Sequence, residues 1–303
     1  MTPTPEPTQS EAPTHTPVDT APTAHDLRLG LIGDNIARSR SPLLHRLAGA
    51  QTGRRVCYDS LIPRELDQSF DEVFATCAAS GYRGINVTYP YKEIVITRLS
   101  IQDPLVRAMG AVNTVLFESE GPVGYNTDYS GFVAAYRGAR GDMPPGVVLM
   151  IGTGGVGRAI AFGLARLGAS EIRLVDHDPE RAEALAEALR PVAPDTALTI
   201  WTDAEAAAQG AQGLINATPV GMVGYDGTPL VRAAMAGADW AFDAVYTPSD
   251  TQFLTDAAAS GLDVISGWEL FFHQGVDAWG HFVGTELDQS ALRAALLAPE
   301  NAE

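Results

Sequence analysis

Short apolar runs alternate, over most of the chain, with segments in which hydrophobic residues recur every three or four positions. In the first half of the chain the short runs predict strands within residues 27–33, 56–62 and 82–90. The helical spacing predicts helices at residues 41–53 and 66–80, and a further helix that starts at residue 92. Ser41 is expected as the N-cap of the first helix, with Pro42 at the first helical position. Residues 111–128 predict a hairpin followed by a loop.

A second series of strands and helices begins near Gly131. An apolar strand, a glycine-rich turn and an amphipathic helix follow one another over residues 147–168. Further strands are predicted at residues 171–178, 196–201, 213–218, 240–245 and 262–267. Further helices are predicted at residues 179–190, 268–284 and 291–298. Strands that alternate with helices are typical of an α/β protein with parallel strands, so we expect that class.

The first 26 residues have a different composition from the rest of the chain. They hold six prolines and seven threonines, and no Lys, Arg or aromatic residue. Such a segment has no apolar face to bury, so residues 1–26 are expected to form a disordered leader. The segment also has neither a basic region nor an apolar core, which argues against a secretory signal.

The acidic balance of the chain limits its partners. Lys and Arg number 20 and Asp and Glu number 37 among 303 residues, which gives a formal net charge of −17. Binding to nucleic acid or to an anionic membrane surface needs clustered cations, so neither is expected. Two cysteines exclude a disulfide scaffold and a four-cysteine zinc site, and no metal site is predicted. No apolar run reaches the ~18 residues of a membrane span, so we expect a cytoplasmic protein.

The turn after the strand at residue 147 fits the pattern G-x-G-x-x-G, with Gly152, Thr153, Gly154, Gly155, Val156 and Gly157. In a dinucleotide-binding protein the first glycine allows the tight turn and the second lets a pyrophosphate approach the backbone. The third lets the helix pack closely on the strand, and the helix N-terminus faces the phosphates. The position between a strand and a helix favours this interpretation over an ordinary tight turn. The pattern therefore predicts a Rossmann domain, a doubly wound parallel sheet that binds a nicotinamide dinucleotide.

The end of the next strand indicates which dinucleotide is bound. Asp176 lies 19 residues after Gly157, where an acidic residue of this fold accepts hydrogen bonds from the ribose hydroxyls. A carboxylate there also repels a 2′-phosphate. Arg181 is the nearest cation and could in principle reach a phosphate. We therefore predict NAD as the preferred cofactor, with NADP as the alternative.

Polar side chains follow the predicted strands of the first half, at Ser39, Ser41, Asn86, Thr88, Lys92, Asn113 and Asp128. The carboxyl ends of strands in an open α/β sheet face a common crevice. A lysine and an aspartate in that crevice could handle the proton that leaves an alcohol during hydride transfer. By themselves, residues of these types are more often ordinary loop or cap residues than catalytic ones.

Eight motifs of the chain resemble, in order and spacing, those of the shikimate dehydrogenase family: GLIGDNIARSRSPLLH, GINVTYPYK, GAVNTV, GYNTD, GTGGVGRA, INATPVGM, DAVYTP and FFHQ. The resemblance covers nearly the whole chain from Leu27 to the last predicted helix. It implies an enzyme that interconverts 3-dehydroshikimate and shikimate by hydride transfer with a nicotinamide dinucleotide. It also implies two domains, an α/β substrate-binding domain and the Rossmann domain.

The resemblance assigns roles to individual residues. Lys92 and Asp128 match the catalytic Lys–Asp pair, which relays the proton of the reacting hydroxyl and polarises the developing alkoxide. Ser39 and Ser41 match the pair that holds the substrate carboxylate. The groups expected to bind the ring hydroxyls or the carboxylate, or to line the site, are Asn86, Thr88, Asn113, Gln274 and Tyr246. The motifs INATPVGM and DAVYTP place Asn216, Thr218 and Val245 at the cofactor.

The resemblance also gives a domain layout. The substrate-binding domain is expected at residues 27–128 and is completed by residues 266–303, with the NAD-binding domain at residues 129–265 between them. His273 lies beside Gln274 and is expected to be a packing or cap residue, because the Lys–Asp pair already accounts for the proton.

Three departures separate the chain from biosynthetic members, which commonly carry Asn-Arg-Thr after the second Rossmann strand. Here that place reads Val-Asp-His-Asp at residues 175–178, Pro219 replaces a common serine, and Tyr129 and Ser130 precede the glycine after NTD. These features resemble the NAD-preferring quinate/shikimate dehydrogenase branch.

Several alternatives stay open at the level of the sequence. The substrate is shikimate, quinate or both, and an aminoshikimate-type acid is a further alternative. The enzyme could instead be an NADP-dependent biosynthetic shikimate dehydrogenase, a non-catalytic ligand-binding or regulatory member, or a dehydrogenase of similar design acting on folates or amino acids. A monomer and a homodimer are both compatible with the resemblance.

Overall fold

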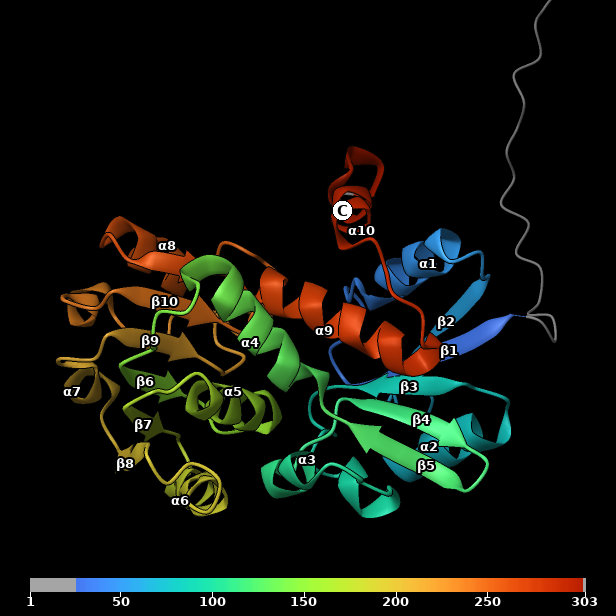
Figure 1. The fold of residues 1–303 in the computed structure, drawn as a ribbon, viewed down its shortest axis with the longest axis horizontal. Helices are drawn as coiled ribbons and strands as arrows, with labels where there is room; N and C mark the ends of the chain where they lie inside the picture. The colour runs from blue at the N-terminus through green and yellow to red at the C-terminus, as the bar shows by residue number, and fades with distance from the viewer. Residues whose placement is uncertain (1–25, 302–303) are drawn as a thin grey trace, which may run out of the picture.

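The computed structural model describes residues 26–301 and contains two β-sheets, each covered by helices (Figure 1). The predicted leader, except for Asp26, lies outside the described residues. Among residues 26–301, no helix combines the length and the apolar character that a membrane span requires. The predicted α/β class is confirmed. The exact division of the chain into domains stays a prediction.

The first sheet has five strands in the order β2-β1-β3-β4-β5. Its strands are β1 (Leu27–Ile32), β2 (Val56–Leu61), β3 (Gly84–Val87), β4 (Thr114–Glu118) and β5 (Gly121–Tyr125). The first three strands of this order are parallel, whereas β4 and β5 are antiparallel to their neighbours. The hairpin predicted within residues 111–128 is therefore confirmed, whereas β1, β2 and β3 follow the parallel arrangement expected of the class. The two residues between β4 and β5 are too few for the crossover that a parallel pair needs.

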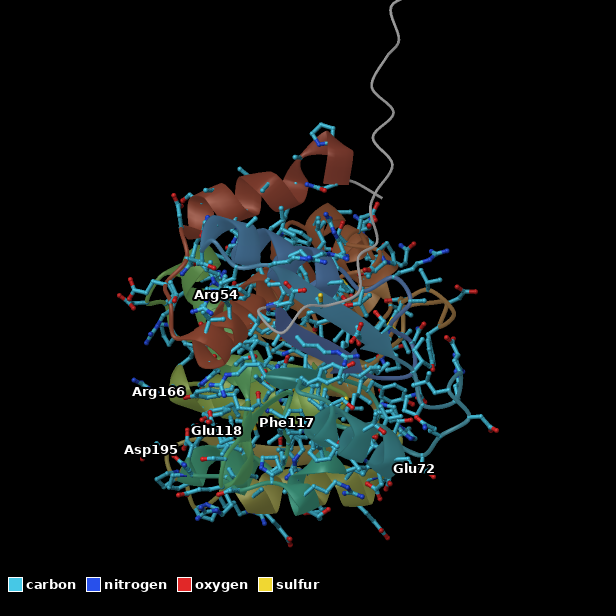
Figure 2. The ribbon with its side chains drawn as sticks, turned by 90° about the vertical axis from the view of Figure 1, so that its right-hand side faces the viewer. Arg54, Glu72, Phe117, Glu118, Arg166 and Asp195 are labelled. Carbon is cyan, nitrogen blue, oxygen red and sulfur yellow. The ribbon has the colours of Figure 1, made fainter. Side chains whose placement is uncertain are left out.

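Three short helices belong to this half, α1 (Ser41–Gln51), α2 (Phe70–Ala79) and α3 (Pro104–Met109). Arg40, not Ser41, occupies the N-cap position of α1, so that prediction was wrong and Pro42 is the second helical residue. The Ser41 hydroxyl accepts a hydrogen bond from Ser39 instead. The side view in Figure 2 shows exposed charged side chains of this half, including those of Arg54, Glu72 and Glu118.

The prediction of a helix that starts at residue 92 was also wrong. Lys92 lies in a turn, and only the 3₁₀ helix η1 (Val95–Arg98) follows it. The carbonyl of Lys92 accepts the backbone N–H of Val112 at 2.9 Å, a contact from far along the chain. Because that carbonyl is engaged outside the segment, tertiary pairing overrides the helical spacing here.

The second sheet has six parallel strands in the order β11-β10-β9-β6-β7-β8. They are β6 (Val147–Ile151), β7 (Glu171–Val175), β8 (Ala197–Trp201), β9 (Gly213–Asn216), β10 (Trp240–Asp243) and β11 (Asp263–Ile265). The helices of this half are α5 (Gly155–Arg166), α6 (Pro179–Leu189), α7 (Ala204–Ala208), α8 (Gln252–Ala259) and the 3₁₀ helix η2 (Arg232–Met235). The strand order reverses at β6, between β7 and β9, so a ligand crevice is expected outside the carboxyl ends of these strands.

Two long helices, α4 (Thr127–Arg140) and α9 (Gly267–Val283), run between the sheets and pack along each other (Figure 1). Phe132 and Tyr136 of α4 are buried in the core of the second sheet. Trp279 and Phe282 of α9 are buried against the first sheet. The chain ends with α10 (Gln289–Leu297) and the 3₁₀ helix η3 (Pro299–Asn301).

The packing of α4 on α9 depends on a glycine. A Cβ atom added at Gly131 would lie 2.9 Å from the backbone nitrogen of Gln274 and 3.2 Å from its Cα. These neighbours are backbone atoms, so the two helices would have to move apart to accept a side chain.

We expect Gly131→Ala to lower the free energy of unfolding by about 1–3 kcal/mol, the usual cost of overpacking a close contact. The control is Gly138→Ala on the same helix, where an added Cβ meets no atom within 4 Å. That variant should be more stable by about 0.5–1 kcal/mol, because alanine favours the helix. Urea unfolding measures both, and a Gly131→Ala variant as stable as the parent protein would contradict the packing argument.

Candidate functional site

A buried lysine and a buried aspartate form an ion pair where the two halves of the chain meet. The Nζ atom of Lys92 lies 2.6 Å from Oδ2 of Asp128, and the two side chains are only 13% and 6% exposed. Lys92 follows β3, and Asp128 lies in the first turn of α4, where the positive end of the helix dipole favours a carboxylate. The structure thus brings together the two residues predicted to be catalytic.

The glycine-rich turn of the second sheet lies directly against this lysine. A Cβ atom added at Gly155 would be 2.8 Å from Cβ of Lys92. An ion pair crosses the same boundary, because Arg181 at the start of α6 donates a hydrogen bond to Glu93 at 2.6 Å. The lysine turn and the nucleotide half are therefore in contact at Lys92 and at the next residue, Glu93.

Amide and hydroxyl groups form a buried hydrogen-bond network beside the ion pair. The Asn86 amide donates to the Thr114 hydroxyl at 3.1 Å and to the Asn113 carbonyl at 3.4 Å. The Asn113 amide donates to Oε1 of Gln274 at 3.4 Å, and its Oδ1 accepts the backbone N–H of Thr127 at 2.8 Å. The network thus joins the predicted substrate contacts Asn86, Asn113 and Gln274 to Thr127, the residue before Asp128.

The two predicted carboxylate-binding serines form a second polar cluster with a tyrosine. The Ser39 hydroxyl donates to the Ser41 hydroxyl at 3.2 Å and accepts from the Tyr246 hydroxyl at 3.4 Å. Tyr246 stacks on Phe271 of α9, and burial raises the pKa of its hydroxyl, so it remains a donor. The guanidinium of Arg40 binds the carbonyls of Leu296 and Asn301, which fixes the serine loop to the end of the chain.

Two residues that the sequence analysis missed belong to these clusters. Tyr58 of β2 is buried and donates to Oδ1 of Asn86 at 2.9 Å, and it also hydrogen-bonds Ser41. Tyr58 therefore connects the two polar clusters. Thr114 was missed because it reads as an ordinary strand residue, although it lies in the quoted motif GAVNTV. Thr88 lies after β3, in the same loop as Lys92, and its methyl group is close to Gly33.

The glycine-rich turn has the geometry that a bound dinucleotide requires. Gly152 has a positive φ of 99°, and a Cβ atom added at Gly157 would be 2.3 Å from the Gly152 carbonyl oxygen. Gly154 is the N-cap of α5 and supplies no side-chain hydrogen bond to the first turn, so the N–H groups of that turn are open to a phosphate. Val156 packs on the core of this sheet.

Asp176 follows β7 and is tied to the same turn. Its Oδ2 atom accepts the backbone N–H of Thr153 at 2.7 Å and the Thr153 hydroxyl at 2.6 Å. Burial alone would raise the pKa of this carboxyl, but these bonds and the N–H of Asp178 outweigh burial and lower it. The pKa of Asp176 is therefore lowered, and the carboxylate accepts hydrogen bonds beside the glycine-rich turn.

The predicted cofactor residues after β9 and β10 are held by one buried carboxyl group. Oδ1 of Asp243 accepts Nδ2 of Asn216 at 3.0 Å and the backbone N–H of Val245 at 2.9 Å, and Oδ2 accepts the Thr251 hydroxyl at 2.6 Å. Asn216 in turn accepts the backbone N–H and the hydroxyl of Thr218. Sequence reasoning missed Asp243, although it opens the motif DAVYTP. Burial raises its pKa to about 6.

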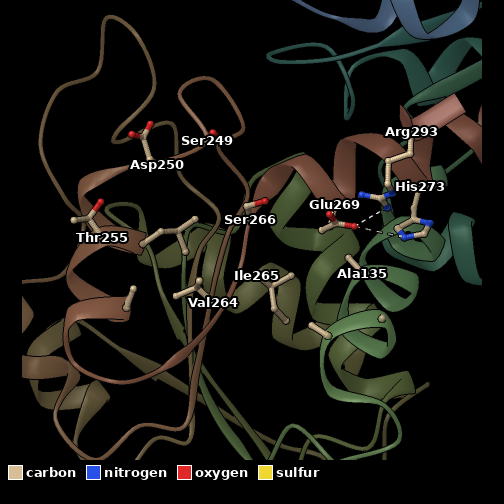
Figure 3. A pocket seen from close by; sticks show the side chains of 14 residues that line it. Ala135, Ser249, Asp250, Thr255, Val264, Ile265, Ser266, Glu269, His273 and Arg293 are labelled. Atoms are coloured by element: carbon tan, nitrogen blue, oxygen red, sulfur yellow. Dashed lines mark hydrogen bonds and ion pairs between the residues drawn. The ribbon is translucent and has the colours of Figure 1, made fainter. Parts of the chain in front are cut away.

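A separate cavity of about 730 Å³ lies between α4, α8 and α9, and Figure 3 shows its lining. His273 lines it, with Nε2 3.9 Å from Glu269, whose carboxylate is bound by Arg293 at 2.8 Å. The His273 ring also packs edge-on against Phe272. The residues that line this cavity include no predicted substrate or cofactor residue.

The buried Asp243 makes stability depend on pH. Its pKa of about 6 in the folded protein lies above the ~3.9 of an unfolded aspartate. The protonated carboxyl group therefore stabilises the fold at low pH, and this stabilisation is lost between about pH 4 and pH 6. Asparagine cannot titrate at this position. We therefore expect the free energy of unfolding of Asp243→Asn, relative to that of the parent protein, to rise by on the order of 3 kcal/mol between pH 4 and pH 7. Urea unfolding at several pH values measures this difference.

The control is Thr251→Val, which removes one hydrogen bond but keeps the carboxyl group. It should lower stability at every pH. Because the lost bond favours the carboxylate, the pKa of Asp243 should rise further, and the loss of stability should continue above pH 6. Parallel stability curves for Asp243→Asn and the parent protein would contradict the assignment.

Comparisons with known proteins agree with this geometry. Residues 31–115 match the shikimate dehydrogenase substrate binding domain, and residues 147–224 match the family described as NADP oxidoreductase coenzyme F420-dependent. The quinate/shikimate dehydrogenase (NAD(+)) of Corynebacterium efficiens is 36% identical over 281 residues, which cover 90% of this chain and 99% of that protein. The shikimate dehydrogenase (NADP(+)) of Pseudarthrobacter chlorophenolicus is 37% identical over 278 residues, 89% of this chain and 94% of that protein.

Solved structures show the same similarity over nearly the whole chain. Quinate dehydrogenase from Corynebacterium glutamicum in complex with NAD has a TM-score of 0.82 at 32% identity, and the match covers 90% of this chain and 99% of that one. Shikimate 5-dehydrogenase from Thermus thermophilus, in complex with NADP(H) and shikimate, has a TM-score of 0.77 at 33% identity, covering 89% and 98%. The chain therefore belongs to the shikimate dehydrogenase family of NAD(P)-dependent oxidoreductases that act on a CH–OH group.

Proposed function

We propose that the protein transfers a hydride between NAD and the ring carbon that bears a hydroxyl group of shikimate, quinate or both. The oxidised products are 3-dehydroshikimate and 3-dehydroquinate, and the reaction releases one proton. The buried contact of 2.6 Å between Lys92 and Asp128 carries the proposal, because it puts a proton-transfer pair beside the nucleotide turn. Relatives named for both acids support the choice of substrate.

The ion pair is proposed to handle the proton of the reacting hydroxyl. Bound NAD supplies the hydride acceptor. When the carbonyl form of the substrate is reduced, negative charge grows on its oxygen, and the Lys92 ammonium would stabilise this charge and donate the proton that completes the hydroxyl group. In the reverse direction the hydroxyl proton would leave through the same pair of residues. Asp128 keeps Lys92 oriented and takes part in passing the proton toward solvent.

The remaining polar groups are proposed to orient the ring. Ser39, Ser41 and Tyr246 offer three hydroxyl groups close together, which suits a carboxylate. Asn113 and Gln274 lie nearer to the ion pair and suit the ring hydroxyls. This local arrangement of donors explains how a chain with a net charge of −17 would bind an anion.

Two features of the nucleotide half support NAD rather than NADP. The ionised Asp176 would accept hydrogen bonds from ribose hydroxyls and would repel a 2′-phosphate. Arg181, the cation that could reach a phosphate, is engaged by Glu93 at 2.6 Å. The NADP-dependent relatives keep the biosynthetic alternative open to test. The proposed cytoplasmic location and the state of association, monomer or homodimer, are independent of this argument.

A steady-state assay with shikimate or quinate, each with NAD or NADP, tests the proposal. We expect kcat/KM with NAD to exceed that with NADP by about tenfold or more, which corresponds to ~1.4 kcal/mol of repulsion at Asp176. Asp176→Ala should lower the ratio of kcat/KM with NAD to kcat/KM with NADP. Equal use of both cofactors with no effect of Asp176→Ala would contradict the NAD preference, and activity with shikimate and NADP alone would favour the biosynthetic alternative. Absence of activity in all four reactions, with cofactor binding intact, would favour a non-catalytic protein or another substrate.

Replacing the lysine tests the proton transfer. We expect Lys92→Ala to lower kcat by ~10² or more, because it removes the acid–base group, and to change the KM for substrate much less. Steady-state kinetics measures both constants, and NAD binding followed by fluorescence is the control for an intact nucleotide half. A variant with near-normal turnover would exclude Lys92 from the chemistry.

A further inference from the structure

Arg40 stands between Ser39 and Ser41, the two serines that are proposed to bind the carboxylate of the substrate. Its Nη2 atom donates to the carbonyl of Leu296 at 2.6 Å and to the carbonyl of Asn301 at 2.7 Å. These carbonyls belong to the last turn of α10 and to η3, which lie 256 and 261 residues later in the chain. The segment of residues 39–41, the serine loop, is therefore attached to the last helix.

The two hydrogen bonds of Arg40 are of a strong kind. Carbonyl groups in the last turn of a helix have no N–H group of the same helix to bind, and the helix dipole places negative charge there. A guanidinium supplies both the donor and the positive charge, and hydrogen bonds from a charged donor are stronger than neutral ones. The guanidinium also lies over the ring of Trp268, 5.1 Å from its centre. Arg40 is thus held from two directions.

The helix that binds Arg40 is itself fixed to the helices beneath it. It lies beside α1 (Figure 1), and Leu296 is buried in an apolar cluster with Leu44 of α1 and Phe272 of α9. Arg293, one turn before Leu296, makes two hydrogen bonds of 2.8 Å with the carboxylate of Glu269 on α9. Helix α10 is therefore a firm support for the Arg40 side chain.

A second contact joins α1 and α10 at their opposite ends. Nε2 of Gln51 donates to the carbonyl of Asp288 at 3.1 Å, and Oε1 of Gln51 accepts the backbone N–H of Asp288 at 2.8 Å. The two helices are therefore antiparallel and linked at both ends. Gln51 lies about 15 Å along the helix from Ser41, at 1.5 Å per residue, so this contact fixes α10 without touching the serine loop.

The bonds within the serine loop are weaker than its bonds to α10. The Ser39 hydroxyl bonds the hydroxyl and the backbone N–H of Ser41 at 3.2 and 3.3 Å, and the Tyr246 hydroxyl at 3.4 Å. These distances lie beyond the usual length of a hydrogen bond from a hydroxyl or amide, whereas both Arg40 bonds are short. A carboxylate binds more tightly when its donors are in place beforehand, so the Arg40 bonds matter for its affinity.

We propose that Arg40 is a positioning residue that anchors the serine loop to α10, so that the last helix takes part in recognising the carboxylate of the ring acid. This inference rests on the proposed function, because the carboxylate is that of the proposed substrate. The anchor acts on binding of the acid. The proton transfer at Lys92 and the nucleotide turn lie on other elements, so both should be spared.

Substitutions at Arg40 separate anchoring from charge. Arg40→Met removes both bonds and keeps an apolar side chain over Trp268. A single nitrogen of Arg40 makes both bonds, so the ammonium of Arg40→Lys, which has three donors, offers the same bonds. Arg38→Met is the matched control for charge, because Arg38 is an exposed arginine two residues earlier. Gln51→Ala is the control for a looser α10, because it acts at the far end of the helix pair.

We expect Arg40→Met to raise the KM for the ring acid about tenfold, with a smaller change in kcat and an unchanged KM for NAD. Arg40→Lys should recover much of this loss. Arg38→Met should keep the KM of the parent protein, and Gln51→Ala should lower the Tm while keeping that KM. Steady-state kinetics at one ionic strength and thermal unfolding measure these effects.

Asn301 allows the same anchor to be tested from the side of the last helix. Its Nδ2 atom donates to the carbonyl of Ala295 at 2.9 Å, which folds η3 back on α10 and sets the position of the Asn301 carbonyl. We expect Asn301→Ala to raise the KM for the ring acid about two- to threefold in the parent protein. In the Arg40→Met background it should have no further effect, because the bond that it perturbs is already absent.

A parental KM in Arg40→Met, or equal effects of Arg40→Met and Arg38→Met, would overturn the proposal. Additive effects of Arg40→Met and Asn301→Ala would overturn it as well. A parental KM in Asn301→Ala would assign Arg40 to a direct contact with the carboxylate instead, and this comparison holds even if Arg40→Met does not fold. An inactive parent protein would overturn the proposed function and the role of Arg40 together, whereas an active parent with unaffected variants would overturn the role alone.

Discussion

The close packing of α4 on α9 is the constraint on which the site depends. The first turn of α4 carries Thr127 and Asp128, and the middle of α9 carries Gln274. Because Gly131 has no side chain, the α4 backbone approaches Gln274 directly, and the three polar residues lie on one side of the contact. Phe132 and Trp279 bury the other faces of these helices in the two sheets. The same contact therefore joins the two halves and places the helix that carries Asp128 directly against the helix that carries Gln274.

Around this contact the interior is polar, which would be costly without complete pairing. Unpaired buried amides and hydroxyls cost about 1–3 kcal/mol each, so such a network is stable only when its donors and acceptors match. Here Asn86, Asn113 and Thr114 satisfy one another. Tyr58, which stacks on the His45 ring, donates to Asn86 from the neighbouring strand. Because these groups are neutral, the charges beside the network are those of the ion pair between Lys92 and Asp128.

In the nucleotide half, two carboxyl groups accept hydrogen bonds from residues at the strand ends and in the loops that follow them. Asp176 accepts hydrogen bonds from the backbone and the hydroxyl of Thr153, so the acid proposed to bind the ribose also holds the glycine-rich turn in place. Asp243 does the same for Asn216 and Val245 at the neighbouring strand ends. The ion pair between Arg181 and Glu93 then spans the boundary next to Lys92. The nucleotide turn and the proton-transfer pair are thus held in one fixed relation.

The sequence by itself determined the α/β class, the strands around the glycine-rich turn and most of the residues that meet in the site. These features are local, since hydrophobic spacing, a glycine pattern and short motifs report the nearby chain. Tertiary structure decided the rest. Lys92 lies in a turn because Val112, distant along the chain, occupies its carbonyl. The parts played by Tyr58 and Asp243 follow from contacts between strands and loops far apart in sequence, and no local pattern encodes such contacts.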